Sequence, residues 1–309
     1  MKIGLASVDS KIPNLALMKI SAYHKLRGDK VELFSPLFGG YDLVYASKVF
    51  TDTPDDQYLP HNTIKGGSGY NLKTTLPEKI ESIYPDYSLF NCDYAMGFTS
   101  RGCCRNCPWC IVPEKEGKIK AVADIYSFWN GQKYLMLFDN NLTALPLHFR
   151  LILQQIRFQG IYVDFNQGLD IRLINLEVAQ VLATINLWKQ LRFAWDSMNY
   201  EQEVRRGIQI LIDGGVTPRK LMFYVLIGFN TTPEEDLYRV KTLRELGIDS
   251  FVMPYNKKDE YQKSFARWVN HKAIFKSVEW KDYDKFYRRH KPKKYKLNNE
   301  REGTEIYKG

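Results

Sequence analysis

The sequence predicts an α/β protein, a partial (β/α)6 TIM-like barrel preceded by a small parallel α/β domain. After Asp93, six short apolar runs alternate with segments of helical spacing, which is typical of a parallel sheet. This stretch ends near Asn256 and is much shorter than the roughly 250 residues of an eight-unit barrel. The first fifty residues add a separate strand–helix–strand pattern.

The N-terminal residues account for the small α/β domain. Apolar runs at 3–8, 31–34 and 43–46 indicate strands, and residues 14–27 have helical spacing that ends at Gly28. Residues 51–77 are rich in Thr, Pro, Gly and Asn, so we expect a linker there. Its Gly66-Gly67-Ser68-Gly69 run favours either a simple connection or a flexible lid.

The barrel elements follow from the alternation after Asp93. Pro233 with three acidic residues after it marks a helix start, and Asp213-Gly214-Gly215 marks a helix stop. We expect strands at 94–98, 135–138, 161–165, 191–195, 221–227 and 251–253, and helices at 147–158, 176–182, 201–212 and 233–246.

Three domains are expected from these patterns. They are a small α/β domain at 1–90 with its linker from about residue 51, a barrel at 91–256 and a C-terminal extension at 257–309. The extension mixes basic and aromatic residues, a composition that can bind nucleic-acid backbone and stack bases. A solvated helix or a disordered tail would have the same composition.

The net charge and the hydropathy of the sequence limit the kinds of binding partner to expect. The net charge of +9 favours anionic partners such as nucleic acid, nucleotides or phosphates, although it also serves solubility. No apolar run approaches the length of a membrane span, and the N-terminus lacks the apolar stretch of a signal peptide. We therefore expect a cytoplasmic protein with no membrane partner.

All five cysteines lie between Cys92 and Cys110, whereas a disulfide framework would spread them along the chain. Cys103, Cys107 and Cys110 have the spacing C-x3-C-x2-C, and three thiolates this close can hold three irons of a [4Fe–4S] cluster. The fourth iron would stay open for a substrate or cofactor. The competing reading is a zinc site that takes Cys92 or Cys104 as fourth ligand, although such sites usually have two separated C-x2-C pairs.

The cysteine run resembles the cluster loop of the radical S-adenosylmethionine (radical SAM) superfamily, which reads C-x3-C-x-aromatic-C. Trp109 fills the aromatic position. Gly102 before the loop, and Ile111-Val112-Pro113 with Gly117 after it, resemble the methylthiotransferase and cobalamin-associated branches. The resemblance covers roughly residues 93–256.

This resemblance implies two cofactors, a [4Fe–4S] cluster and S-adenosylmethionine (SAM), and a Rossmann-like domain before the barrel. The methionyl amine and carboxylate of SAM would chelate the open iron. An electron from a donor such as flavodoxin or ferredoxin would then cleave SAM, and the resulting 5′-deoxyadenosyl radical would abstract hydrogen from a substrate.

The chain departs from both branches. No G-x-G-x-x-G follows the first strand, and the cobalamin signature D-x-H-x-x-G is missing after Asp9. Methylthiolation would normally need a second cluster, but no cysteine precedes Cys92. The sequence therefore predicts a structural or gating role for the first domain and leaves the substrate and the reaction outcome open.

Site residues are expected where the strands end, because chemistry in parallel barrels gathers at their carboxyl ends. After the second strand, Asp139 or Asn140 would accept the SAM amino group, with helix capping by Asn140 or Asn141 as the alternative. After the third, the set Asp164, Gln167, Asp170 and Arg172 would contact SAM or substrate, or form a salt-bridged turn.

The later strands add two candidates. By position and resemblance, Asp196 after the fourth strand would bind the ribose of SAM. After the fifth strand, Gly228 is the one glycine that matches the family's loose G-x-I-x-G-x-x-G element, which lies beside the adenine of SAM in that family.

A second hypothesis, from another class of function, is a nucleic-acid-binding module whose zinc or iron–sulfur centre is structural.

Overall fold

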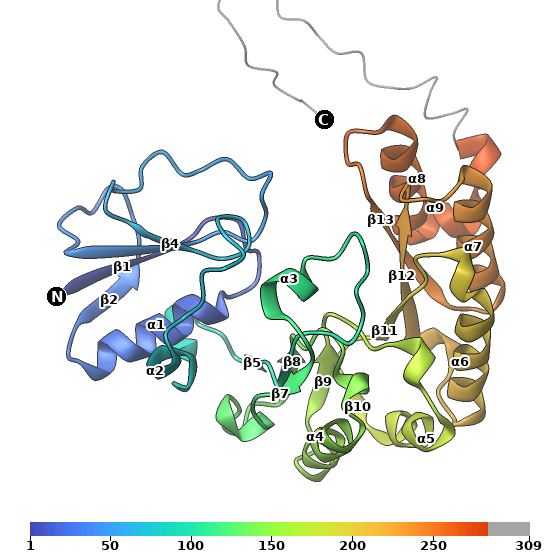
Figure 1. The fold of residues 1–309 in the computed structure, drawn as a ribbon, viewed down its shortest axis with the longest axis horizontal. Coiled ribbons are helices and arrows are strands. Elements are labelled where there is room, and N and C mark those ends of the chain that lie inside the picture. The colour runs from blue at the N-terminus through green and yellow to red at the C-terminus, as the bar shows by residue number, and fades with distance from the viewer. Residues whose placement is uncertain (284–309) are drawn as a thin grey trace, which may run out of the picture.

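The computed structural model describes residues 1–283, and its N-terminal part is a four-stranded parallel sheet (Figure 1). The strand order is β2-β1-β3-β4, so the chain leaves the central strand β1 first to one side and then to the other. Helix α1 (Leu15–Leu26) begins at Asn14, whose side chain accepts the amide of Leu17. The strands are β1 (Lys2–Ser7), β2 (Lys30–Leu33), β3 (Leu43–Ser47) and β4 (Ile64–Gly66).

The helix packs on this sheet through a small separate core. Leu17 and Ile20 of α1 are buried against Ile3 and Leu5 of β1, and Ile80 closes the cluster. Ile80 belongs to α2 (Glu78–Glu81), which precedes the 3-10 turn η1 (Tyr87–Phe90). The strand–helix–strand prediction for this region is confirmed.

One strand was missed. Residues 51–77 were expected to be a linker, but β4 lies within them and pairs with β3. It is only three residues long and its Ile64 and Lys65 are exposed, so no apolar pattern marks it. Gly67 follows with φ +94°, and a Cβ there would meet the Lys48 carbonyl oxygen. Only glycine lets the chain turn so close to the end of β3.

The second half of the chain forms two parallel sheets with strand orders β10-β9-β8-β5 and β11-β12-β13. All six expected strands are present within two residues of their predicted bounds, and β10 is an addition. The strands are β5 (Ala95–Gly97), β8 (Tyr134–Leu137), β9 (Tyr162–Phe165), β10 (Asn186–Leu187), β11 (Leu191–Ala194), β12 (Leu221–Ile227) and β13 (Asp249–Pro254).

Between residues 1 and 283 the six strands do not form one continuous ladder, because β10 occupies the edge of β9 that β11 would need. Side chains join the sheets instead. Arg192 of β11 pairs with the Asp164 carboxylate and donates to the Phe165 carbonyl at 3.3 Å. The α/β class with parallel sheets is confirmed, whereas a single six-stranded barrel stays a prediction.

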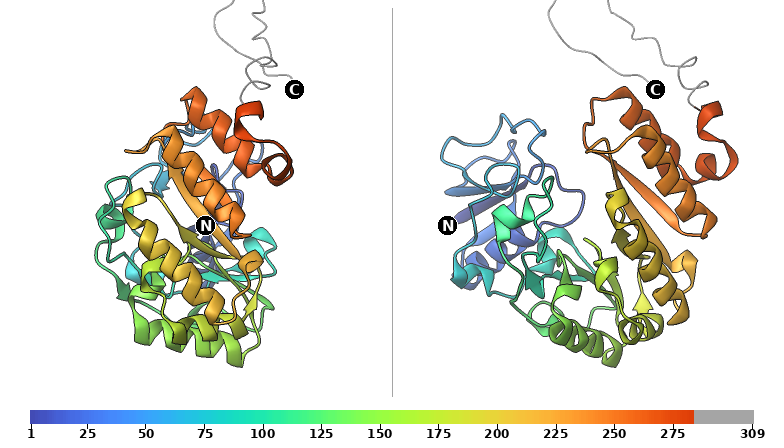
Figure 2. Two further views of the ribbon diagram at one scale, coloured as in Figure 1. Left: turned by 90° about the vertical axis from the view of Figure 1, so that its right-hand side faces the viewer. Right: turned by 45° about the vertical axis from the view of Figure 1, so that its right-hand side comes forward.

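The two sheets form an arch with helices along its outer side (Figures 1 and 2). The main core lies between the sheets and these helices, with Phe149, Phe193 and Phe223 among its buried residues. The capping box of Thr232 and Glu235 confirms the start of α7. The helices are α4 (Pro146–Phe158), α5 (Leu176–Thr184), α6 (Glu201–Asp213) and α7 (Pro233–Glu245).

The expected C-terminal extension is only partly described. Helices α8 (Glu260–Asn270) and α9 (Lys272–Ser277) follow β13, and Phe265 and Trp268 are fully buried in the main core. Residues 284–309, which hold much of the basic and aromatic sequence, lie outside the described part. Within residues 1–283, no helix has the length and apolar character needed to cross a bilayer.

Candidate functional site

The cysteine loop connects β6 (Ser100–Arg101) to the short helix α3 (Val112–Glu116) on the inner side of the arch (Figure 1). One carboxylate holds its two ends together. Glu116 accepts the Gly102 amide at 3.0 Å and an Arg101 guanidinium N–H at 3.1 Å. It also accepts Asn140 Nδ2 at 2.7 Å, so the end of β8 is tied to the loop.

Gly102 is the glycine on which this closure depends. Its φ is +82°, and a Cβ there would lie 2.6 Å from the Gly117 carbonyl oxygen, a backbone atom that cannot rotate away. We expect Gly102→Ala to destabilise the fold by about 1–3 kcal/mol and to lower the iron content of the reconstituted protein severalfold. Iron analysis and urea denaturation measure the two effects.

Gly160→Ala is the matched control, because Gly160 also has a positive φ, +64°, but has open space around its Cβ position and lies after α4. The Gly160→Ala variant therefore has the backbone strain of a positive φ but no steric clash at the cysteine loop. If both variants retained the same iron, the proposed closure of the cysteine loop by Gly102 would be wrong.

The three sulfurs of the triplet are free thiols, with Cys110 exposed and the other two half-buried. Backbone N–H groups point at two of them, from Arg105 to Cys103 Sγ at 3.3 Å and from Val112 to Cys110 Sγ at 3.5 Å. Hydrogen bonds of this kind tune iron–sulfur clusters. Burial raises the pKa of the Cys107 thiol, and the neighbouring Cys110 raises it further, so an iron centre would have to supply the opposing charge.

Three free cysteine thiols in one loop have the donor chemistry of an iron–sulfur cluster rather than of a preformed single-metal site. In residues 1–283, no three His, Cys, Asp or Glu side chains converge closely enough for a single metal ion. Cys92 lies before β5, at the opposite end of that strand from the loop, and donates to the Tyr94 carbonyl at 3.2 Å. Cys104, the other candidate for a fourth zinc ligand, is exposed.

Asp139 and Asn140, the candidates for binding the SAM amino group, both form hydrogen bonds with residues next to the cysteine loop. Asp139 is 4% exposed and accepts the Thr99 hydroxyl at 2.7 Å and the Ser100 hydroxyl at 2.6 Å, besides both backbone amides. Burial raises its pKa while these donors oppose the rise. In this arrangement Asp139 fixes the end of β5, and Asn140 binds Glu116.

Asn141, which sequence reasoning considered only as a helix cap, lies between the cysteines and the third strand. Its Nδ2 is 3.5 Å from Cys103 Sγ and 3.4 Å from Asp170 Oδ2. It makes no side-chain cap bond. A single amide thus connects the sulfur of the first cysteine to the acidic group behind the loop.

Asp170 holds two arginines side by side. Its carboxylate accepts Arg105 Nε at 2.9 Å and Arg172 Nε at 2.7 Å. Burial would raise the pKa of Asp170, but the two guanidiniums outweigh it and hold the pKa below its usual value. Arg172 also lies over the Tyr200 ring, 4.7 Å from its centroid. The pair is therefore fixed, and within residues 1–283 some of its guanidinium N–H groups have no acceptor.

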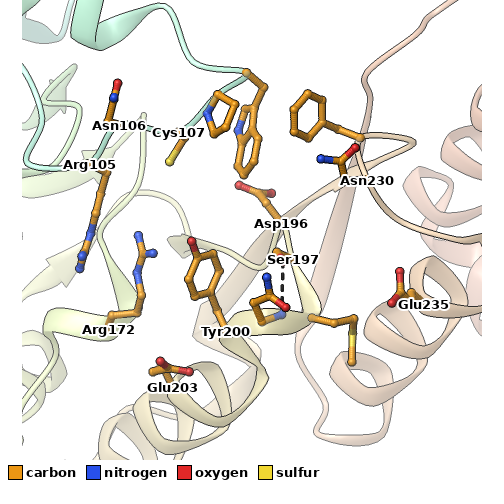
Figure 3. A pocket seen from close by; sticks show the side chains of 15 residues that line it. Arg105, Asn106, Cys107, Arg172, Asp196, Ser197, Tyr200, Glu203, Asn230 and Glu235 are labelled. Atoms are coloured by element: carbon orange, nitrogen blue, oxygen red, sulfur yellow. Dashed lines mark hydrogen bonds between the residues drawn. The ribbon is translucent and has the colours of Figure 1, made fainter.

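A cavity of about 470 Å³ lies beside these arginines, within the size range of sites for small ligands (Figure 3). Cys107, Trp109 and Asp196 all line it. The Asp196 carboxylate accepts the Leu226 amide at 3.0 Å, and burial raises its pKa. The remaining lining residues are Arg105, Asn106, Pro108, Arg172, Ser197, Met198, Asn199, Tyr200, Glu203, Phe229, Asn230 and Glu235.

An aromatic series forms one wall of the cavity. The Trp109 and Phe229 rings meet edge-to-face with centroids 5.1 Å apart, and Phe229 meets Tyr255 in the same way at 4.9 Å. The cysteine loop is thereby packed against the ends of β12 and β13.

The structure brings only some of the predicted site residues to this cavity. Cys107, Trp109 and Asp196 line it, and Asp170 supports two lining arginines. Gln167 is exposed and donates to Asn166 Oδ1. Gly228 lies beside the lining residue Phe229, where a Cβ would collide with the Gln262 side chain. Asp164 pairs with Arg192 at the junction of the two sheets.

Sequence reasoning missed several polar lining residues, among them Tyr200, Glu203, Asn230 and Glu235. They follow the fourth and fifth strands, where the same strand-end rule that found Asp196 would have found them. Glu203 and Glu235 lie in the first turns of α6 and α7, where acidic side chains commonly stabilise the helix N-terminus, so the sequence gives no sign of another role.

Asp170→Asn tests the arginine pair. The amide keeps the shape but loses the charge that orients both guanidiniums. Charge-assisted hydrogen bonds contribute about 1.5–3 kcal/mol, so if SAM binds here as the resemblance implies, we expect its affinity to fall by about tenfold or more. Isothermal titration with reconstituted protein measures it. Asp213→Asn, on an exposed helix end, is the control, and an unchanged affinity in Asp170→Asn would contradict this role.

No family model and no curated protein matches the chain. Among solved structures, the fold is similar to the radical SAM methyltransferase TsrM from Kitasatospora setae, whose structure has cobalamin and a [4Fe–4S] cluster bound. The TM-score is 0.61 at 12% identity, over 82% of this chain and 74% of that chain. At that identity the likeness is one of fold, so the chain has a mixed α/β fold like that of a radical SAM enzyme, with no branch assigned.

The first sheet of this chain does not fit a cobalamin-type ligand at its natural crevice. In open α/β sheets such ligands bind beyond the strand ends where the strand order reverses, here between β1 and β3. Asp9 spans that point and accepts the amides of Val49 and Phe50, both at 2.8 Å. A Cβ on Gly69 would lie 2.7 Å from the Phe50 carbonyl oxygen. The chain's own residues therefore occupy the hydrogen-bonding groups at this point, and no step is derived through cobalamin.

Proposed function

We propose that this chain is a radical SAM enzyme in which Cys103, Cys107 and Cys110 each bind one iron of a [4Fe–4S] cluster. The observation that carries the proposal is that Cys107 lines the same cavity as Trp109, Asp196 and two fixed guanidiniums. When bound, the cluster supplies the electron that cleaves SAM reductively, delivered by a donor such as flavodoxin or ferredoxin.

The chain's own residues would bind and orient SAM in this cavity. Arg105 and Arg172 present N–H donors suited to the methionyl carboxylate. The Asp196 carboxylate is placed to accept ribose hydroxyl protons, and the aromatic wall of Trp109 and Phe229 would exclude water beside the adenine. Asp139, Asn140 and Asn141 would hold the loop in place, whereas Gln167 and Gly228 remain candidates for the cavity rim.

The two later sheets would act together as the partial (β/α)6 barrel of this proposal. Arg192 and its contacts across the sheet junction support that reading, as does the fold similarity. The first sheet would close the arch without a cofactor of its own, since the chain's own residues occupy the hydrogen-bonding groups at its crevice. The substrate and the fate of the radical stay outside the proposal.

Anaerobic reconstitution with iron and sulfide tests the cofactor directly. We expect about four irons per chain and, after dithionite reduction, a paramagnetic signal that changes when SAM is added. A change on SAM addition requires an iron that the protein leaves open. Zinc retained in place of iron, or a cluster whose signal ignores SAM, would favour a structural centre instead.

A further inference from the structure

A cluster of aromatic and basic residues lies at the end of the strands opposite the cysteine loop. Its members all stand at or just before the start of a strand, except Trp188, which lies between β10 and β11. We call this cluster the aromatic–basic edge, and it consists of Tyr94, Lys133, Tyr134, Tyr162, Trp188, Lys189, Arg219 and Lys220. Part of it lines a second cavity of about 590 Å³.

The rings of the edge form an unbroken series. Trp188 contacts Tyr94 with centroids 5.0 Å apart and Tyr134 at 5.1 Å, and Tyr134 contacts Tyr162 at 5.7 Å. None of the four rings is fully buried, and Tyr162 is 37% exposed. Tyr94 and Trp188 also pack against the buried Met96 and Met136, so the four rings form one aromatic series that the protein covers only in part.

The cations of the edge lie over these rings. Lys189 Nζ is 5.5 Å from the Trp188 centroid, and Lys133 Nζ is 5.4 Å from that of Tyr162. Among residues 1–283, neither lysine has an ion-pair partner, nor has Arg219 or Lys220. Of the nearby acids, Asp249 is paired with Lys272, and Asp93 is a single exposed carboxylate. The edge therefore carries an uncompensated positive charge.

We propose that the aromatic–basic edge binds single-stranded nucleic acid. Exposed rings stack with unpaired bases, and flanking cations neutralise the phosphates, which is how sequence-tolerant single-strand binding works. An acidic peptide would use the cations and leave the rings without a partner. A duplex hides its base faces, so it could use only the charge. The inference is independent of the proposed function, because such a surface needs no cluster.

Fluorescence anisotropy with the full chain and a labelled thymidine oligonucleotide of about 12 nucleotides tests it. The charge variant is Lys189→Glu with Arg219→Glu and Lys220→Glu. We expect affinity to fall at least tenfold and the salt slope to become shallower by about 2, at about 0.7 per lost phosphate contact. The control, Lys11→Glu with Lys73→Glu and Lys263→Glu, makes the same charge change at exposed sites elsewhere and keeps residues 284–309 intact.

A second pair of variants tests the rings. Tyr162→Ser removes a stacking face, so we expect at least fivefold weaker binding, whereas Tyr162→Phe retains the ring and should bind like the parent. Thermal unfolding of both checks that the fold is kept. The proposal would be overturned if the charge variant and its control lost the same affinity, or if the chain did not bind the oligonucleotide at all. It would also be overturned if a duplex bound equally well, or if polyglutamate displaced the probe as readily as unlabelled oligonucleotide.

Discussion

Cys107→Ala abolishes the reductive cleavage of SAM if the proposed site is correct. Cys107 is the one member of the triplet that lines the cavity, and its loss leaves two thiolates for a cube that needs three protein ligands here. We expect iron after reconstitution to fall far below about four per chain, and 5′-deoxyadenosine formation to fall to the level seen without reductant. The fold should persist, since the side chain is half-buried in a loop.

Cys104→Ala is the matched control for this prediction. Cys104 is adjacent to the proposed first ligand but is exposed, and within residues 1–283 its side chain has one hydrogen-bond partner, Asn141 Nδ2 at 3.6 Å. It should retain the iron content and most of the cleavage activity. If Cys104→Ala lost its iron and Cys107→Ala kept it, the assignment of ligands from the C-x3-C-x2-C spacing would be wrong.

Arg239→Ala should give the largest loss of stability of any substitution considered. Arg239 is fully buried and forms an ion pair with Asp236, which is also buried. Its other N–H groups donate to the carbonyls of Trp195 at 2.6 Å and Leu226 at 3.0 Å, at the ends of β11 and β12. Removing it leaves the buried Asp236 carboxylate without its cation, with the Tyr261 hydroxyl at 3.1 Å still donating to it, and takes one donor from each of the two carbonyls. Breaking a buried ion pair in this way costs about 3–5 kcal/mol.

The same substitution should disturb the cavity, because Asp196 directly follows Trp195 and bonds to the Leu226 amide. Urea denaturation at constant m-value measures the stability loss, and SAM titration measures the effect on the site. Arg206→Ala, on the exposed face of α6, should change stability by no more than about 0.5 kcal/mol. A loss below about 1 kcal/mol in Arg239→Ala would contradict the role given to this network.

Apolar periodicity predicted most of the fold. Apart from β10, the strands of the two later sheets are buried on at least one face, so each of them leaves an apolar run in the sequence. Strands that are held only by backbone hydrogen bonds to a neighbouring strand, without a buried face, leave no apolar run. β4 is exposed and three residues long, and β10 has only two residues. The break between the sheets depends on β10 and on the Arg192 side chain, neither of which a local pattern reveals.

Candidate site residues could be selected from the sequence where a short motif or a strand end marks them. The cysteine spacing and the strand-end rule selected Cys107 and Asp196, which line one cavity, whereas their roles stay predictions. The strand-end rule could not tell which carboxylates face the cavity. Asp139 and Asp170 both follow strands, yet one is enclosed by Thr99 and Ser100 while the other orients two arginines. Such differences arise from contacts about 40 and 65 residues apart along the chain.

The most direct measurement is the amount of 5′-deoxyadenosine formed from SAM by the anaerobically reconstituted chain with and without dithionite. We predict formation that requires reductant, scales with bound iron and vanishes in Cys107→Ala. A protein that holds a full complement of iron, binds SAM and yet forms no 5′-deoxyadenosine under reduction would contradict the account.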